Sequence, residues 1–123
     1  MAARYPRECR LLTAAGFQRV FKHCEHKASD RLITILASGN GLNHARLGTV
    51  VSIKAAGNAV KRNRIKRLIR ESFRERQAML GGVDLVVLVR PGISARSNQQ
   101  IIRTLDNHWR TIAAHAHTAT PAD

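Results

Sequence analysis

The sequence has few of the residues on which several protein classes depend. Its two cysteines, Cys9 and Cys24, are too few for a disulfide scaffold. Although His23 and His26 flank Cys24, no C-x-x-C or H-x₃₋₅-H pair supplies the spacing of a zinc site. No window approaches the ~18 consecutive apolar residues of a membrane span, and the first residues lack the apolar stretch of a secretory signal. We therefore expect a cytoplasmic protein with reduced thiols, no zinc and no membrane partner.

Acidic residues are scarce as well. Eight Asp and Glu stand against 21 Lys and Arg, a formal net charge of +13 at pH 7. Cleavage of RNA with a protein-bound metal needs carboxylates that converge on magnesium, but only Glu71 and Glu75 share a helix face, among arginines. A metal-free mechanism could instead use His23, His26 or His108. Neither pattern meets the requirements of a catalytic site, so the sequence predicts no catalytic residue and no metal ligand.

Apolar residues, in contrast, are as frequent as in ordinary folded proteins. They make up 44% of the 123 residues, which allows a packed core and argues against a disordered basic tail. The length fits one domain. We expect residues 1–123 to form it, ordered from about 8 to 114 with flexible termini. A folded domain with this positive excess attracts polyanions, and the abundant polyanion of a cell is nucleic acid.

Hydrophobic periodicity predicts the element order α-β-β-α-β-α. The expected elements are a helix after the N-cap residue Thr13, strands at 32–37 and 47–53, a helix from 59 or 60 to about 79, a strand at 84–90, and a helix capped by Ser94 or Ser97. The remaining expectations are an extended arm at 1–12, a loop at 23–30, an extra short strand around 53–58 and a frayed end at 115–123. Turn residues 38–41 favour an antiparallel hairpin between the first two strands. These runs indicate a mixed sheet covered by helices but no strand order.

The central helix concentrates the charge, because nine of the 21 cations lie between Lys54 and Arg76. A helical wheel places its apolar residues on one face and Lys66, Arg70 and Arg74 in an i, i+4, i+8 row on another. Like charges in such a row repel by a few tenths of a kcal/mol per pair, so a polyanion partner explains the row better than folding does. A membrane surface is the weaker interpretation because no Trp- or Leu-rich face accompanies the charge. DNA is also weaker, because few side chains remain for base edges.

The segment from Gly57 to Arg74, GNAVKRNRIKRLIRESFR, resembles the Arg-Asn-Arg signature of the bacterial ribonuclease P protein component. Residues 10–22, with the run FQRVFK, are similar to the family's first helix, and RLG followed by VVS at 46–52 is similar to its second strand. The resemblance spans about residues 8–112. It is more specific than a short glycine pattern that recurs by chance.

This resemblance implies an α+β fold, a single-domain αβββαβα sandwich like that of a ribosomal protein, with an unusual left-handed crossover. It also implies the RNA-binding subunit of a ribonucleoprotein endonuclease that removes the 5′ leader from precursor tRNA. The catalytic RNA and its bound Mg²⁺ would cut, while the protein would bind the single-stranded leader and that RNA, with no obligate protein partner. The alternative is a structural RNA-binding protein of the ribosomal kind.

The resemblance further implies two sets of site residues. The leader set is Phe17, Phe21, Ile35, Lys54, Lys66 and Arg70. The set for the catalytic RNA is Lys61, Arg62, Asn63, Arg64, Arg67 and Arg74. Spacing alone favours Phe17 and Phe21 as core residues, whereas the family likeness favours at least one of them as a stacking surface for an unpaired base. Ile35, or Thr34 in another register, stands where relatives often carry an aromatic residue, so aliphatic contact would replace stacking there.

Overall fold

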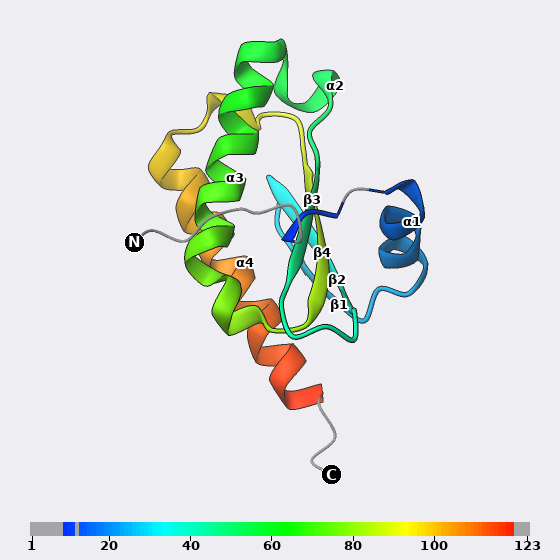
Figure 1. The fold of residues 1–123 in the computed structure, drawn as a ribbon. Helices are drawn as coiled ribbons and strands as arrows, with labels where there is room; N and C mark the ends of the chain where they lie inside the picture. The colour runs from blue at the N-terminus through cyan, green and yellow to red at the C-terminus, as the bar shows by residue number, and fades with distance from the viewer. Residues whose placement is uncertain (1–8, 12, 120–123) are drawn as a thin grey trace.

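A computed structural model describes residues 9–11 and 13–119, with side chains described as far as His115. A four-stranded sheet has α1 (Ala14–Lys22) on one face and the long helices α3 (Ala59–Leu80) and α4 (Asn98–Ala119) on the other (Figure 1). The observed order, with short helical turns added, is the αβββαβα sandwich that the resemblance implied. Residues 1–8 and 12 of the expected arm, and residues 120–123 of the expected frayed end, lie outside the described residues.

The sheet consists of β1 (His26–Ser29), β2 (Ile33–Gly39), β3 (Arg46–Val50) and β4 (Val83–Val89) in the spatial order β1-β2-β4-β3. The β1–β2 and β2–β4 pairs are antiparallel, and the β3–β4 pair is parallel. The expected hairpin between β2 and β3 is therefore wrong, because β4 inserts between them. The expected loop at 23–30 is also wrong, since it contains β1. A parallel pair needs a long crossover, and α3 supplies it.

The helix starts follow local side-chain caps. Thr13 Oγ1 accepts a hydrogen bond from Gly16 N at 3.0 Å, which confirms the predicted start of α1. Ser97 and Gln100 form a reciprocal capping box at the start of α4, so Ser97 rather than Ser94 is its cap. α4 continues through Ala119, beyond the expected frayed end at residue 115.

The segment expected as an extra strand around 53–58 is instead the helical turn α2 (Ile53–Ala56). Ser52 Oγ accepts from Ala55 N at 3.1 Å and starts this turn. Asn58 Oδ1 accepts from Lys61 N at 3.0 Å and starts α3 immediately afterwards. Two adjacent caps therefore replace the extended conformation expected for this segment. The short 3₁₀ turn η2 (Ile93–Ala95) similarly joins β4 to α4.

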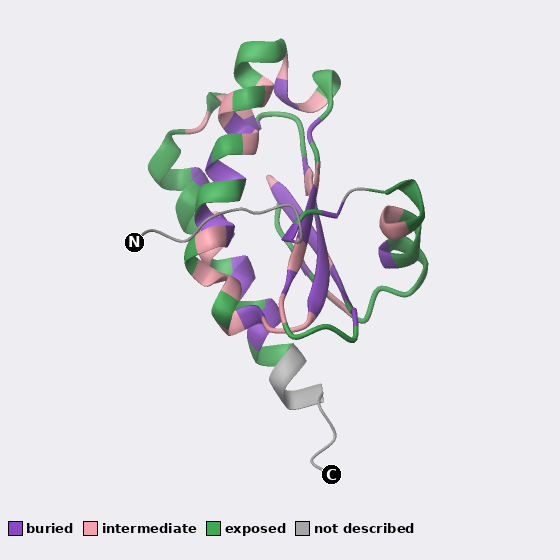
Figure 2. Cartoon of the chain, in the orientation of Figure 1, coloured by how far each residue is buried: buried purple, intermediate pink, exposed green. Residues whose placement is uncertain are grey.

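The main core lies between the sheet and the helix pair α3–α4. Trp109 and Phe73 are wholly buried there, with ring centroids 6.0 Å apart in an edge-to-face arrangement. Trp109 Nε1 donates to Ser72 Oγ at 2.8 Å, which satisfies the buried indole. Buried residues in Figure 2 gather on the strands and on the inward sides of the long helices. The predicted apolar face of the central helix is confirmed at its buried members, which are Ile65, Leu68, Ile69, Ser72, Phe73 and Leu80.

The other face of the sheet carries a much smaller apolar cluster under α1. Leu11, Val20 and Val86 are its buried members, with Phe17, Leu36 and Leu88 packed partly buried against them. Figure 2 shows most of α1 exposed. This face of the sheet therefore holds α1 in place while most side chains of α1 stay exposed to solvent. None of the helices among the described residues combines the length and the hydropathy that a membrane span requires.

Candidate RNA-binding site

Phe17 lies across the backbone of β3. A Cβ added to Gly48 would lie 2.7 Å from Phe17 Cε1 and closer still to Cζ. A glycine inside a strand often marks such a close approach, and here it leaves room for the aromatic ring. Phe17 is partly exposed while its inner edge packs on the α1 cluster. Phe17 is therefore neither a fully buried core residue nor a fully exposed one, and its stacking with a base stays a prediction.

Phe21 lies one turn further along α1 and is 49% exposed. The residue between them on the buried side of the helix is Val20, which is wholly buried and anchors α1 to the sheet. The exposed aromatic ring offers a flat apolar surface to solvent. Such a surface can stack with an unpaired base.

A pocket at the β3 edge brings α1 and α3 together. Its lining residues are Arg10, Leu11, Phe17, Leu47, Gly48, Thr49 and Arg70. Because β3 is an edge strand, side chains from both faces of the sheet reach the same opening. We call this opening the β3-edge groove. It joins an aromatic ring on one side to the Arg70 guanidinium on the other.

Of the six predicted leader residues, only Phe17 and Arg70 line the β3-edge groove. Phe21, Lys54 and Lys66 lie outside its lining. Lys54 is exposed on α2, and Lys66 is partly exposed on α3, where its backbone oxygen accepts from Arg70 Nε at 3.3 Å.

The prediction for Ile35 is wrong. Ile35 is wholly buried in the core shared with α3 and α4, on the face of the sheet opposite α1. The alternative register does not rescue it, because Thr34 is 4% exposed and its hydroxyl accepts from Arg90 Nη2 at 2.9 Å. Leu36 is the β2 residue that packs in the α1 cluster. Strand alternation would have indicated Leu36 once the face under α1 was known.

The sequence argument also missed Gly48, Arg10 and Leu11 as parts of the groove. Leu11 N donates to Leu47 O at 2.9 Å, which pairs the residues before α1 with the edge of β3. This pairing is non-local, so no signal in the sequence fixes it. Gly48 did carry a signal, since a lone glycine in a strand suggests close contact with another group.

The residues predicted to meet the catalytic RNA lie along α3 and are accessible. The exposed ones are Lys61, Asn63 and Arg67, and the partly exposed ones are Arg62, Arg64 and Arg74. The row Lys66, Arg70 and Arg74 has no ion pair among the described residues. No described acidic side chain therefore pairs with the row.

Arg64 has an internal role that the sequence did not predict. Its guanidinium donates to Asn98 Oδ1 at 2.9 Å, Ser94 O at 3.2 Å and Arg96 O at 2.7 Å. These bonds fasten α3 to the segment that connects η2 to α4. Three of its five N–H donors are used inside the protein, so Arg64 orients the neighbouring loop as well as contributing charge.

The acidic residues of the core and its edges are paired away from the α3 row. Asp84, 1% exposed, accepts two hydrogen bonds from Arg46 at 2.7 Å and one from Asn40 at 3.0 Å. The hydrogen bond to Asp84 raises the pKa of Arg46 above its ordinary value, with the Coulomb attraction of the carboxylate adding to it and desolvation opposing it. Asp106 contacts Arg76 at 2.5 Å and Arg110 at 3.2 Å. Asp84 and Asp106 thus hold parts of the fold together and do not contact the α3 row.

A sequence model of the family described as ribonuclease P matches residues 5–113. The chain belongs to the ribonuclease P protein family. It is 46% identical over 109 residues to the ribonuclease P protein component of Idiomarina loihiensis, covering 89% of this chain and 87% of that one. The corresponding protein of Chromohalobacter salexigens is 44% identical over 108 residues, covering 88% and 84%. The solved structure of the Staphylococcus aureus RNase P protein is 34% identical, with a TM-score of 0.77 over 83% of this chain and 93% of that one.

Family membership assigns this chain to the RNase P holoenzyme as a subunit in tRNA processing. It also implies association with the RNase P RNA. The alternative of a ribosomal-type structural protein is not favoured, because relatives and solved structures alike are RNase P proteins.

Proposed function

We propose that this subunit binds the single-stranded 5′ leader of precursor tRNA at the β3-edge groove and the adjoining face of α1, while α3 binds the catalytic RNA. The observation that carries the proposal is the presence of Phe17 and Arg70 in one opening. An aromatic ring can stack on an unpaired base, and a guanidinium can donate paired hydrogen bonds to the adjacent phosphate. A single strand presents both groups along its length, whereas a duplex hides its base faces.

Phe21 and Lys66 would extend this contact beyond the groove. Phe21 continues the aromatic surface along α1, and Lys66 adds a positive charge one turn from Arg70 on α3. Lys61, Arg62, Asn63, Arg67 and Arg74 would contact the catalytic RNA along the rest of α3. The protein would then raise substrate affinity by reducing the phosphate repulsion between two RNAs.

We propose that the catalytic RNA performs the hydrolysis and holds the Mg²⁺. Among residues 9–11 and 13–115, no group of three or more His, Cys, Asp or Glu side chains is arranged to hold a metal. Asp84 and Asp106 are already bound to arginines. These residues do not fit a magnesium site, so no chemical step is assigned to them.

The test compares precursor tRNA with and without its leader, each bound by the catalytic RNA in the presence and absence of this protein. We expect the protein to strengthen binding of the leader-bearing precursor well beyond that of the leaderless one. Equal gains for the two substrates would contradict leader binding. A parallel reaction with protein, Mg²⁺ and precursor but no catalytic RNA should leave the precursor intact, and cleavage there would contradict RNA-based hydrolysis.

A further inference from the structure

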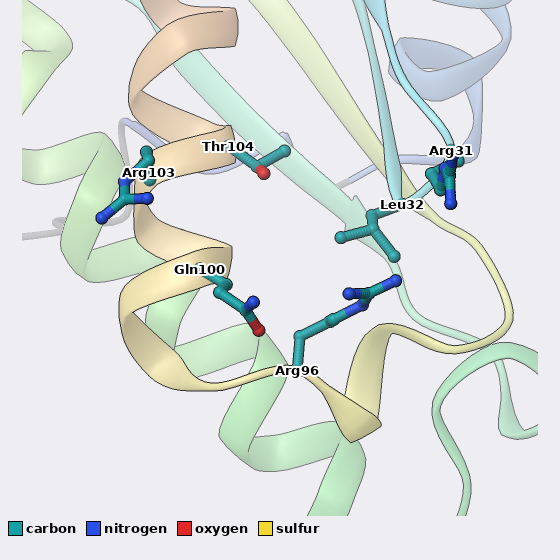
Figure 3. A pocket seen from close by; sticks show the side chains of 6 residues that line it. All are labelled: Arg31, Leu32, Arg96, Gln100, Arg103 and Thr104. Carbon is teal, nitrogen blue, oxygen red and sulfur yellow. The ribbon is translucent and has the colours of Figure 1, made fainter.

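A second basic pocket lies at the opposite edge of the molecule from the β3-edge groove. It is lined by Arg31, Leu32, Arg96, Gln100, Arg103 and Thr104 (Figure 3). Arg31 and Leu32 belong to the turn between β1 and β2, Arg96 follows η2, and the other three lie on α4. Because β1 and β3 form the two opposite edges of the sheet, this pocket and the β3-edge groove cannot bind the same short stretch of nucleic acid.

The arginines of this pocket have no acidic partner. No hydrogen bond or ion pair joins the side chain of Arg31, Arg96 or Arg103 to any described residue. Asp106, three residues after Arg103, contacts Arg76 and Arg110 instead. Asp30, the acid next to Arg31, is also engaged. Its Oδ1 accepts from Leu32 N at 2.8 Å and Ile33 N at 2.9 Å, and its Oδ2 lies 3.3 Å from His108 Nε2. Cations that share an opening without a counter-charge repel one another, so the fold gains nothing from gathering them.

Neutral donors complete the pocket. In Figure 3 the side chains of Arg96 and Gln100 extend into the opening, Arg31 stands across from them, and Arg103 points away along α4. Gln100 Oε1 accepts from Ser97 N at 3.1 Å, which leaves its Nε2 to donate into the opening. Thr104 adds a hydroxyl one turn further along α4. Two guanidinium groups, an amide and a hydroxyl form a donor set suited to a phosphodiester.

A hydrogen bond connects the backbone of the pocket to the basic helix α3. Arg64, within the Arg-Asn-Arg segment, donates to Arg96 O at 2.7 Å. This bond fixes the backbone from which the Arg96 side chain enters the pocket. An RNA strand that follows α3 toward the start of α4 would therefore meet Arg96 next. We propose that the pocket formed by Arg31, Arg96, Gln100 and Thr104 binds a backbone phosphate of the RNase P RNA. This inference depends on the proposed contact of α3 with that RNA.

The test measures binding of the full chain to the RNase P RNA alone as a function of monovalent salt. Each lost phosphate contact lowers the slope of log affinity against log salt by about one unit. We expect Arg96→Gln to lower the slope by about one unit and Arg31→Gln/Arg96→Gln to lower it further. The matched control is Arg110→Gln, which also removes one α4 charge but leaves Asp106 its contact with Arg76. Equal slopes for Arg96→Gln and Arg110→Gln would overturn the proposal.

Further measurements distinguish the RNase P RNA from other ligands of the pocket, namely precursor tRNA and inorganic phosphate. Arg96→Lys should keep the slope while binding more weakly than wild type, because an ammonium replaces the charge but not the paired donors. An effect of the double variant on precursor tRNA alone, with none on the RNase P RNA, would overturn the assignment. The assignment would also be overturned if the double variant lost binding of inorganic phosphate while its affinity for the RNase P RNA stayed unchanged.

The leader experiment keeps this proposal distinct from the proposed function. The double variant should retain the leader-dependent gain, since neither arginine lines the β3-edge groove. Loss of that gain in the double variant, with an unchanged slope for the RNase P RNA, would overturn the pocket assignment. Absence of the gain in the wild type would instead contradict the proposed function, while the slope comparison would still decide the pocket. Unchanged thermal unfolding midpoints verify that the variants fold.

Discussion

The two faces of the sheet differ in how much apolar surface they bury. Between the sheet and the α3–α4 pair, residues such as Phe73 and Trp109 are wholly buried. Under α1, in contrast, Val20 anchors the helix while Phe17 stays partly exposed and Phe21 is 49% exposed. One face supplies most of the stability, and the other keeps aromatic side chains available to a ligand. Substitutions on the two faces should therefore separate stability from binding.

The largest effect is expected at Trp109. Replacing it by Ala removes a wholly buried ring and leaves Ser72 Oγ without its indole partner. Truncation of a buried aromatic residue costs about 3–5 kcal/mol of unfolding free energy. Denaturant unfolding followed by circular dichroism measures this loss. The control on the other face is Phe21→Ala, which should change the unfolding free energy by less than about 1 kcal/mol. Similar losses for the two variants would contradict the contrast between the faces.

The next largest effect is expected at Gly48, where a substitution should lower both stability and leader binding. Gly48→Ala places a methyl group against the Phe17 ring, and such overpacking costs about 1–3 kcal/mol. The ring must move, so the leader-dependent gain in affinity should also fall. Adding Phe17→Leu shortens the obstructing side chain. The double variant should recover stability but not the leader-dependent gain. Recovery of both would show that the Phe17 ring does not contact the leader.

A pure binding effect is expected at Phe21. Phe21→Ala removes an exposed stacking surface, so affinity for a leader-bearing precursor should fall by about 1–3 kcal/mol if one base stacks there. Affinity for the leaderless precursor should not change. Equilibrium binding of both substrates to the reconstituted holoenzyme measures the difference. Phe21→Trp retains an aromatic face and should bind as wild type does, and a loss with Trp equal to the loss with Ala would argue against stacking.

The contrast between the faces also explains which features the sequence could predict. Local signals located α1, α3 and α4, because Thr13, Asn58 and Ser97 cap them and an apolar stripe runs along each. Local signals could not predict the strand order, because β4 pairs with β2 and β3, which lie far from it in the chain.

The candidate site also has one part that the sequence predicted and one part that it did not. The charged row of α3 lies on a single helix, so its spacing predicted a shared accessible face, and the structure has that face. The β3-edge groove combines α1, β3 and α3, and its composition depends on which face each strand residue occupies. Ile35 shows the consequence, since a shift of one residue moves a strand side chain from one face of the sheet to the other. The internal hydrogen bonds of Arg64 could not be predicted either, because their partners, Ser94, Arg96 and Asn98, are brought near only by the tertiary fold.

The smallest effect separates an unpaired cation of α3 from a paired cation of α4. Arg70 lines the β3-edge groove and has no ion pair among the described residues, whereas Arg110 contacts Asp106 at 3.2 Å. Arg70→Ala should lower the dependence of leader-bearing precursor binding on log salt by about one unit at most, because one phosphate contact is lost. Arg110→Ala removes the same charge outside the groove and should leave the slope nearly unchanged. Titrations at several salt concentrations measure both slopes. An unchanged slope for Arg70→Ala would remove this residue from the phosphate contacts, and equal decreases would mean that net charge, rather than the groove, governs binding.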